Sequence, residues 1–116
     1  NGEAQCIVQS VTGIANVSNS LSLTLAAGSD AANRPQAGFV QTFVAGNTPQ
    51  TNWTEYWDVA DNEVMELQYR SDAFDTAALC TASSGTGSWA GIAIEIKAGA
   101  TPSTATHRRM MVGVGS

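Results

Sequence analysis

Charged residues are scarce in this chain of 116 residues: ten acidic and five basic side chains make up only 13% of it, against roughly 25% in an average globular domain. Nucleic-acid-binding proteins cluster Lys and Arg on one face. Here the only adjacent basic pair is Arg108–Arg109, and the net charge is −5. The sequence therefore predicts no nucleic-acid partner. No apolar run approaches the roughly 20 residues of a transmembrane helix, so we expect no membrane partner either.

Histidine is almost absent, and the motifs of several enzyme classes are missing. His107 is the single imidazole and lies beside two arginines near the end of the chain, where a Ser-His-Asp triad is not expected. No GxSxG, HExxH or GxxxxGK[ST] pattern occurs. The glycines of Gly85-Thr86-Gly87 precede a predicted strand, so they are interpreted as turn residues. We expect no enzymatic activity, no catalytic residues and no cofactor.

Only two cysteines, Cys6 and Cys80, occur, and their wide separation excludes a CxxC redox or zinc motif. In an oxidising compartment, a disulfide between them would close a loop of about 75 residues and add on the order of 4 kcal/mol in the chain-entropy model. Two buried thiols are the alternative, because free cysteine is among the most buried residue types. The sequence leaves both open.

The sequence is rich in alternating apolar and polar residues, the pattern of strands with one buried face. Turn-forming clusters of Gly, Pro, Asn, Asp and Ser separate these stretches. We expect an all-β, antiparallel two-sheet β-sandwich, jelly-roll-like, with a C-terminal extension. The predicted strands cover residues 6–11, 21–25, 38–44, 53–59, 65–70, 77–82 and 90–97.

The last predicted strand has the clearest alternation, with isoleucines at every second position. We expect this strand to be central, with Ile92, Ile94 and Ile96 directed into the core and Glu95 and Lys97 facing solvent. By the same argument, the apolar residues of 65–70 would be buried.

The chain divides into three parts. Residues 1–97 form the predicted sandwich, residues 98–106 are small and polar as in a linker, and residues 107–116 return to an apolar pattern. We interpret this end as an assembly peptide that adds to a neighbouring subunit; its rival role is to fold back onto its own sandwich. Its candidate interface residues are Arg108, Arg109, Met110, Met111, Val112 and Val114.

Seven of the ten acidic residues fall between positions 55 and 75, with Arg70 the only base among them. Two functional readings follow: a catalytic acid pair, and a Ca²⁺ site made from hard oxygen ligands. Neither has a diagnostic spacing, so a solvated acidic surface is the default and we predict no metal site. The oxygen donors considered for Ca²⁺ are Asp58, Asp61, Asn62 and Glu63.

Aromatic residues gather at Trp53, Tyr56 and Trp57. Strict alternation places Trp53, Glu55 and Trp57 on one face of a strand and Tyr56 on the other. If exposed beside carboxylates, these rings would form a platform for glycans; the commoner fate of such residues is core packing, which we favour for at least one tryptophan.

Three stretches follow one another as in a known family: Asn52–Asp58 (NWTEYWD), Met65–Arg70 (MELQYR) and Ser84–Lys97 (SGTGSWAGIAIEIK). Together with the basic-then-apolar ending at 108–115, they resemble the C-terminal half of a β-sandwich domain common in structural proteins of tailed phages and prophages. The resemblance covers residues 37–116 and is one of pattern. The first 36 residues match only as generic strands.

This resemblance implies a virion structural protein: an exposed capsid decoration, head-fibre or tail-fibre component. It would assemble in the host cytoplasm, and its partners would be copies of itself and other virion proteins. The alternative is an extracellular carbohydrate-binding or adhesive module that contacts host-surface glycans through Trp53, Tyr56 and Trp57.

Overall fold

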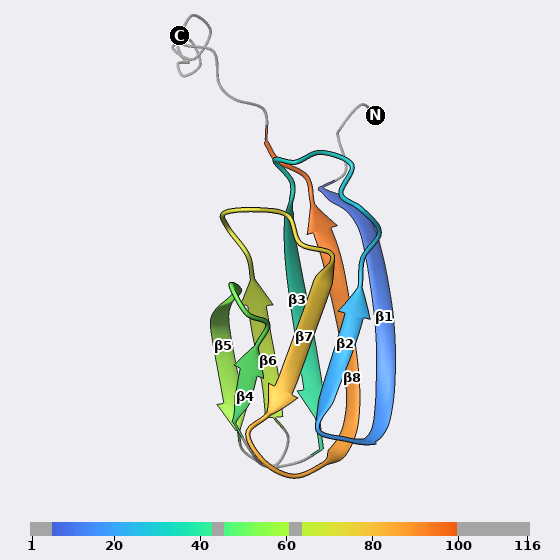
Figure 1. Ribbon diagram of the computed structural model, residues 1–116, viewed down its shortest axis with the longest axis vertical. Helices are drawn as coiled ribbons and strands as arrows, with labels where there is room; N and C mark the ends of the chain where they lie inside the picture. The colour runs from blue at the N-terminus through green and yellow to red at the C-terminus, as the bar shows by residue number, and fades with distance from the viewer. Residues whose placement is uncertain (1–5, 43–45, 61–63, 100–116) are drawn as a thin grey trace, which may run out of the picture.

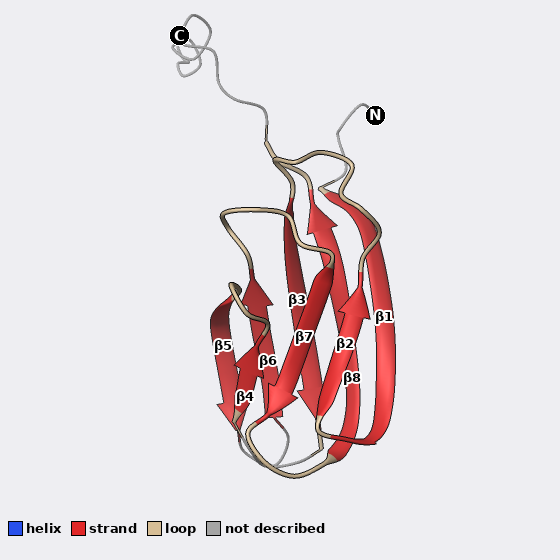
Figure 2. Cartoon of the chain, in the orientation of Figure 1, coloured by secondary structure: helices blue, strands red, loops and turns tan. Residues whose placement is uncertain are grey.

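The computed structural model describes residues 6–42, 46–60 and 64–99, and this part of the chain contains strands and loops but no helix (Figure 2). No helix in this part could therefore cross a membrane. The predicted all-β, two-sheet antiparallel architecture is confirmed. The strands are β1 (Ile7–Ser18), β2 (Ser20–Thr24), β3 (Arg34–Gln41), β4 (Asn47–Pro49), β5 (Thr54–Ala60), β6 (Val64–Tyr69), β7 (Ala77–Ala82) and β8 (Gly87–Ile96).

The strands form a five-stranded sheet of order β1-β8-β3-β6-β5 and a three-stranded sheet of order β2-β7-β4. Strand β1 pairs with β8, β2 with β7 and β3 with β6, all antiparallel. This nested pairing is the jelly-roll pattern, except that β5 joins β6 in the larger sheet. Figure 1 shows the three-stranded sheet lying in front of the five-stranded sheet.

The core lies between the two sheets. Strand β2 contributes Leu21 and Leu23, and the five-stranded sheet contributes Phe39 and Trp89; all four are buried. The Phe39 ring needs Gly91 on the neighbouring strand, because a Cβ there would lie 2.9 Å from Phe39 Cδ1. The core is therefore built from a few large side chains among small ones. Its other members are Leu25, Ala37, Trp53, Ala78, Cys80, Ala82 and Ala93.

The orientation predicted for the last strand is wrong. In β8, Ala93 and Glu95 are fully buried, whereas Ile92 is 45% exposed and Ile94 and Ile96 are only partly buried. Alternation requires two faces but does not say which one is buried. Here a polar residue takes the inner position and the isoleucines point outward.

Strand β6 has the same inverted arrangement. Glu66 and Gln68 are buried, while Met65 and Leu67 are exposed. The register pairs β6 with β3 and β3 with β8, so the two inversions belong to one continuous sheet face. In β6 and at the end of β8, the larger sheet therefore places polar residues inside the sandwich and apolar residues outside it, whereas Phe39, Trp89 and Ala93 still supply its apolar core contacts.

Two further sequence predictions are settled among the described residues. Both cysteines are free, so the disulfide alternative is not realised, and the alternative of two buried thiols holds only for Cys80 in β7, because Cys6 is exposed. Strand β4 occupies a stretch interpreted as a turn, where Asn47 and Thr48 pair with β7. Of the linker predicted at residues 98–106, only 98 and 99 are described, and the peptide predicted at residues 107–116 lies wholly outside the described residues.

Truncation of an inward and an outward apolar side chain tests the orientation of the strands. Leu23→Ala is expected to lower the free energy of unfolding by about 2 to 5 kcal/mol, because it leaves a cavity in the core. Ile92→Ala is expected to lower it by less than about 1 kcal/mol, because half-exposed sites lose little burial. Urea unfolding of both variants measures the difference, and equal losses would contradict the orientation described here.

Candidate functional site

Glu95 is a fully buried carboxylate that joins strand β1 to the loop between β2 and β3. It accepts hydrogen bonds from Gln9 Nε2 at 2.7 Å, the Ser29 backbone N–H at 3.0 Å, Ser29 Oγ at 3.1 Å and Asn33 Nδ2 at 2.6 Å. Burial alone would raise its pKa, but these donors favour the ionised form, and the net effect is to lower the pKa. Satisfied donors make a buried charge tolerable.

The groups around Glu95 are themselves tied to the backbone. The side-chain amide of Gln9 also bonds both backbone groups of Ala26, and Asn33 Oδ1 accepts the N–H of Ala98 at 2.9 Å. The Glu95 cluster, defined here as Glu95, Gln9, Ser29 and Asn33, thus joins β1, the loop after β2 and the end of β8. The hydrogen bonds of this cluster connect these segments, so its role is structural.

Glu66 is a second buried carboxyl, and its pKa is shifted in the opposite direction from that of Glu95. Burial raises its pKa from 4.5 to about 7, and the nearby charges of Glu55 and Asp58 act in the same direction. Gln68 Nε2 donates to Glu66 Oε1 at 2.8 Å, but Glu66 Oε2 and Asp58 Oδ1 have no hydrogen-bond partner among the described residues. Cys80 from the facing sheet also contacts it, and burial raises the pKa of that thiol as well.

The acidic residues do not form a metal site in the part of the chain that is described. Asp58 lies opposite Glu66 in the register of β5 and β6, yet no group of three or more His, Cys, Asp or Glu side chains among the described residues is arranged to hold an ion. Asp61, Asn62 and Glu63 lie outside the described residues.

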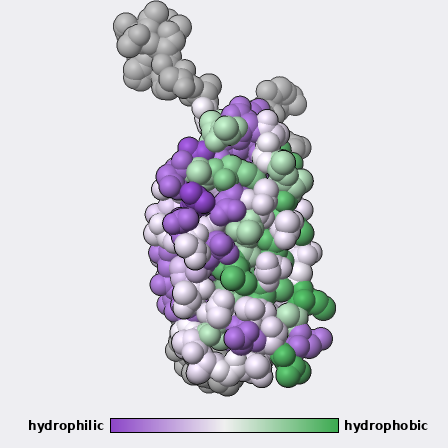
Figure 3. All heavy atoms as spheres, in the orientation of Figure 1, coloured by the Kyte–Doolittle hydropathy of each residue, from purple (hydrophilic) through white to green (hydrophobic). Residues whose placement is uncertain are grey.

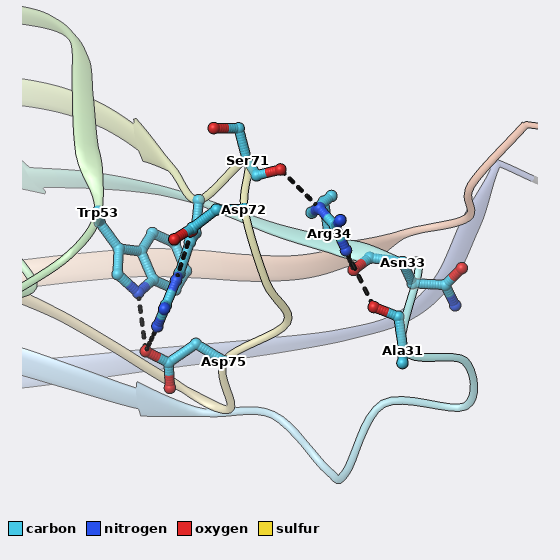
Figure 4. A network of polar contacts seen from close by, with 8 residues as sticks. Ala31, Asn33, Arg34, Trp53, Ser71, Asp72 and Asp75 are labelled. Carbon is cyan, nitrogen blue, oxygen red and sulfur yellow. Dashed lines mark hydrogen bonds and ion pairs between the residues drawn. The ribbon is translucent and has the colours of Figure 1, made fainter.

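The loop between β6 and β7 is held by two arginines (Figure 4). Arg34 donates to the backbone carbonyls of Ser71, Ala31 and Asn33 at 2.8 to 3.0 Å. Arg70 pairs with Asp72 at 2.8 Å and with Asp75 at 3.2 Å.

Asp75 also accepts the indole N–H of Trp53 at 3.1 Å. Although burial opposes ionisation of Asp75, hydrogen bonds from Ala77, Trp53 and Arg70 hold its pKa below the usual value. Trp53 is itself buried. It therefore belongs to the core and is not available to a glycan.

The outer face of the five-stranded sheet, the face turned away from the three-stranded sheet, is mainly apolar. One row across all five strands consists of Thr12, Ile92, Gly38, Leu67 and Trp57. The described positions of this face, following the strand registers, are Ile7, Ser10, Thr12, Ile14, Ala90, Ile92, Ile94, Ile96, Arg34, Gln36, Gly38, Val40, Met65, Leu67, Tyr69, Thr54 and Trp57.

A bulge in β5 adds aromatic surface to the outer face. The register between β5 and β6 shifts between Glu55 and Trp57, which leaves Tyr56 as the extra residue and puts Trp57 on the opposite face from Glu55. The Tyr56 ring packs edge-on against Tyr69, with 6.4 Å between ring centroids. Strict alternation, which placed Tyr56 and Trp57 on different faces, fails here because of the bulge.

A groove of about 700 Å³ crosses the outer face. Its floor is formed at Gly38, where the missing side chain leaves space between the walls of β8 and β6. A Cβ at Gly38 would lie 2.9 Å from Leu67 Cδ2, so the glycine sets the depth of the groove. The walls include Ile92, Ile94, Leu67, Tyr56 and Tyr69.

Charge is nearly absent from this face. Arg34 is the single charged residue among its described positions, and its guanidinium is occupied by loop carbonyls. The apolar surface continues around edge strand β1, where Ile14 and Val17 are exposed. Figure 3 shows hydrophobic residues on the side where β1 lies.

The outer-face groove was missed by the sequence analysis, because its residues were assigned to the core. The predicted assembly residues Arg108, Arg109, Met110, Met111, Val112 and Val114, and also His107, lie outside the described residues. Of the aromatic candidates, Tyr56 and Trp57 are exposed, and both lie on the outer face beside the groove.

No protein-family model, curated protein or solved structure matches this chain.

The two buried glutamates are expected to respond oppositely to replacement by glutamine. Because the folded state keeps a proton on Glu66 that the unfolded state loses above pH 4.5, stability should fall as pH rises from 4.5 to about 7. Glu66→Gln removes this loss. At pH 8 the free energy of unfolding of Glu66→Gln should therefore be higher than that of the unaltered protein by up to about 3 kcal/mol, at about 1.4 kcal/mol per pKa unit.

Glu95→Gln is the matched control, since it should destabilise the protein at the same pH. Its amide N–H₂ would face the donors of Asn33 and Ser29 and leave buried groups unpaired. Chemical unfolding at pH 5 and pH 8 measures both effects. If Glu66→Gln gave no pH-dependent difference from the unaltered protein, the account of Glu66 would be wrong.

Proposed function

We propose that this protein is a structural subunit that acts by assembly rather than by catalysis. The observation that carries the proposal is the outer face of the five-stranded sheet, which is apolar, nearly uncharged and exposed in the isolated chain. Large exposed apolar patches on soluble proteins mark surfaces for association. Aromatic enrichment and depletion of charge, as at Tyr56 and Trp57, are typical of the centre of such interfaces.

A virion component of the decoration, head-fibre or tail-fibre kind suits these properties. Its partners would be copies of itself and other virion proteins, and its location would be the assembled particle. The support is the order of sequence patterns in residues 37–116, together with a sandwich fold whose buried carboxyls serve structure. The segment 107–116 remains a predicted second contact in this assembly.

The second candidate function is carbohydrate binding, and one observation favours it. Tyr56 is 73% exposed and Trp57 is 44% exposed on the same surface, and aromatic rings pack well against sugars. On that reading the chain would be monomeric, and Trp57→Ala would abolish retention on a glycan matrix. Such a loss from a monomeric chain would favour the adhesive module over the assembly subunit.

The full chain is expected to self-associate in a concentration-dependent manner. Sedimentation-velocity runs over a hundredfold dilution series should show a species larger than the monomer at the high end and dissociation at the low end. The association should persist in 0.5 M salt, because apolar burial is not screened. A monomer at every concentration would contradict assembly with copies of this chain.

A further inference from the structure

We infer that the outer face packs against the same face of a second copy, related by a two-fold axis, with Tyr56 of each copy seated in the partner's groove over Gly38. This inference rests on the proposed function, because it names the partner of the assembly surface. A two-fold contact uses the same patch on both subunits, so the patch must be complementary to itself. Charge, size and shape of the outer face each meet this requirement.

Charge favours a second copy as the occupant. The chain carries a net charge of −5, so two copies repel each other over most orientations. The outer face lacks carboxylates at its described positions, and its one cation, Arg34, is bound to carbonyl oxygens. Two copies can therefore meet through this face without bringing like charges together. A strongly basic or acidic partner would find no charge on it to pair with.

The size of the outer face suits a contact between two sheets. Five strands, about 4.8 Å apart and each about six residues deep, span roughly 24 by 20 Å in projection. Because side chains add relief to this projected area, two such faces would together bury about 1,200 Å², the lower bound of standard interfaces. Sheets packed face to face lie about 10 Å apart with interleaved side chains.

The shape of the outer face provides both a projection and a recess. Tyr56 is the most exposed aromatic side chain of the described residues, and the bulge in β5 directs it to the outer face, where it contacts Tyr69. The recess is the groove of about 700 Å³ above Gly38, with Ile92 and Leu67 in its walls. An aromatic ring fills an apolar groove of this kind well and is a frequent anchor of interfaces.

Two substitutions test the contact from its opposite sides. Tyr56→Ala removes the projection, together with the wall that the same ring forms in its own copy's groove. Gly38→Val fills the recess, with only the flexible end of Leu67 in its way. Each should raise the dissociation constant for self-association of the full chain at least tenfold, as measured by sedimentation equilibrium. Tyr56→Phe should retain association. Val17→Thr is the matched control, because Val17 is 80% exposed but lies at the β1 bulge, away from the groove.

The pattern of outcomes separates this inference from the proposed function. Loss of association in Tyr56→Ala and Gly38→Val, with unchanged circular dichroism, supports the two-fold contact. A different result would be that Tyr56→Ala and Gly38→Val associate as well as the full chain, whereas Met111→Lys or Val114→Lys fails to associate. The assembly then uses the C-terminal segment instead of the outer face. That result overturns the inference and leaves the proposed function standing. A monomeric full chain overturns both.

Discussion

The buried carboxylate of Glu95 is the interaction on which the arrangement of the larger sheet depends. Four hydrogen bonds from Gln9, Ser29 and Asn33 stabilise it inside the sandwich. A carboxylate with that many donors cannot be exchanged for a neighbouring side chain without leaving the donors unpaired. Because residues alternate along a strand, fixing Glu95 inward fixes Ile94 and Ile96 outward. Hydrogen bonding across β8, β3 and β6 then carries the same orientation to Leu67.

The inner and outer faces of the larger sheet consequently differ in what they contact. The inner face packs Phe39, Trp89 and Ala93 against the leucines of β2, and it tolerates Glu66 by raising its pKa. The outer face leaves Ile92, Leu67 and neighbouring apolar residues in water. A small sandwich gains from covering such a surface, since each buried apolar Å² contributes about 25 cal/mol. The assembly proposed above would cover these outward-facing apolar side chains.

Much of the fold follows from the sequence, but the assignment of faces does not. Alternation located β2, β6, β7 and β8 and indicated two antiparallel sheets. It could not choose the inner face of β8, because the donors that select Glu95 come from residues 62 to 86 positions away. The bulge at Tyr56 was equally hidden, since one extra residue reverses the alternation after it. Strand β4 is three residues long and pairs through backbone groups, so its sequence resembles a turn.

Exposure separates the three aromatic residues that the sequence brought together as possible glycan contacts. Strict alternation placed Tyr56 and Trp57 on opposite faces of a strand, whereas both are exposed on the outer face. Trp53 shows why aromatic residues close in sequence need not act together, because its indole donates to Asp75 in the core. Gly38 had no signal in the sequence beyond being a glycine within a strand. Its role as the floor of the groove is visible only in the structure, where Gly38 pairs with Ile92 on one side and Leu67 on the other.

Hydroxyl-radical footprinting read by mass spectrometry tests the central claim, that assembly covers the outer face, most directly. The oxidation rates of Tyr56, Trp57 and Met65 should fall when the protein is concentrated enough to assemble, because all three are exposed side chains on this face or at its bulge. The rate at exposed Val17 should change little, which provides an internal reference. Unchanged oxidation of Tyr56, Trp57 and Met65 in an assembled sample would contradict the account.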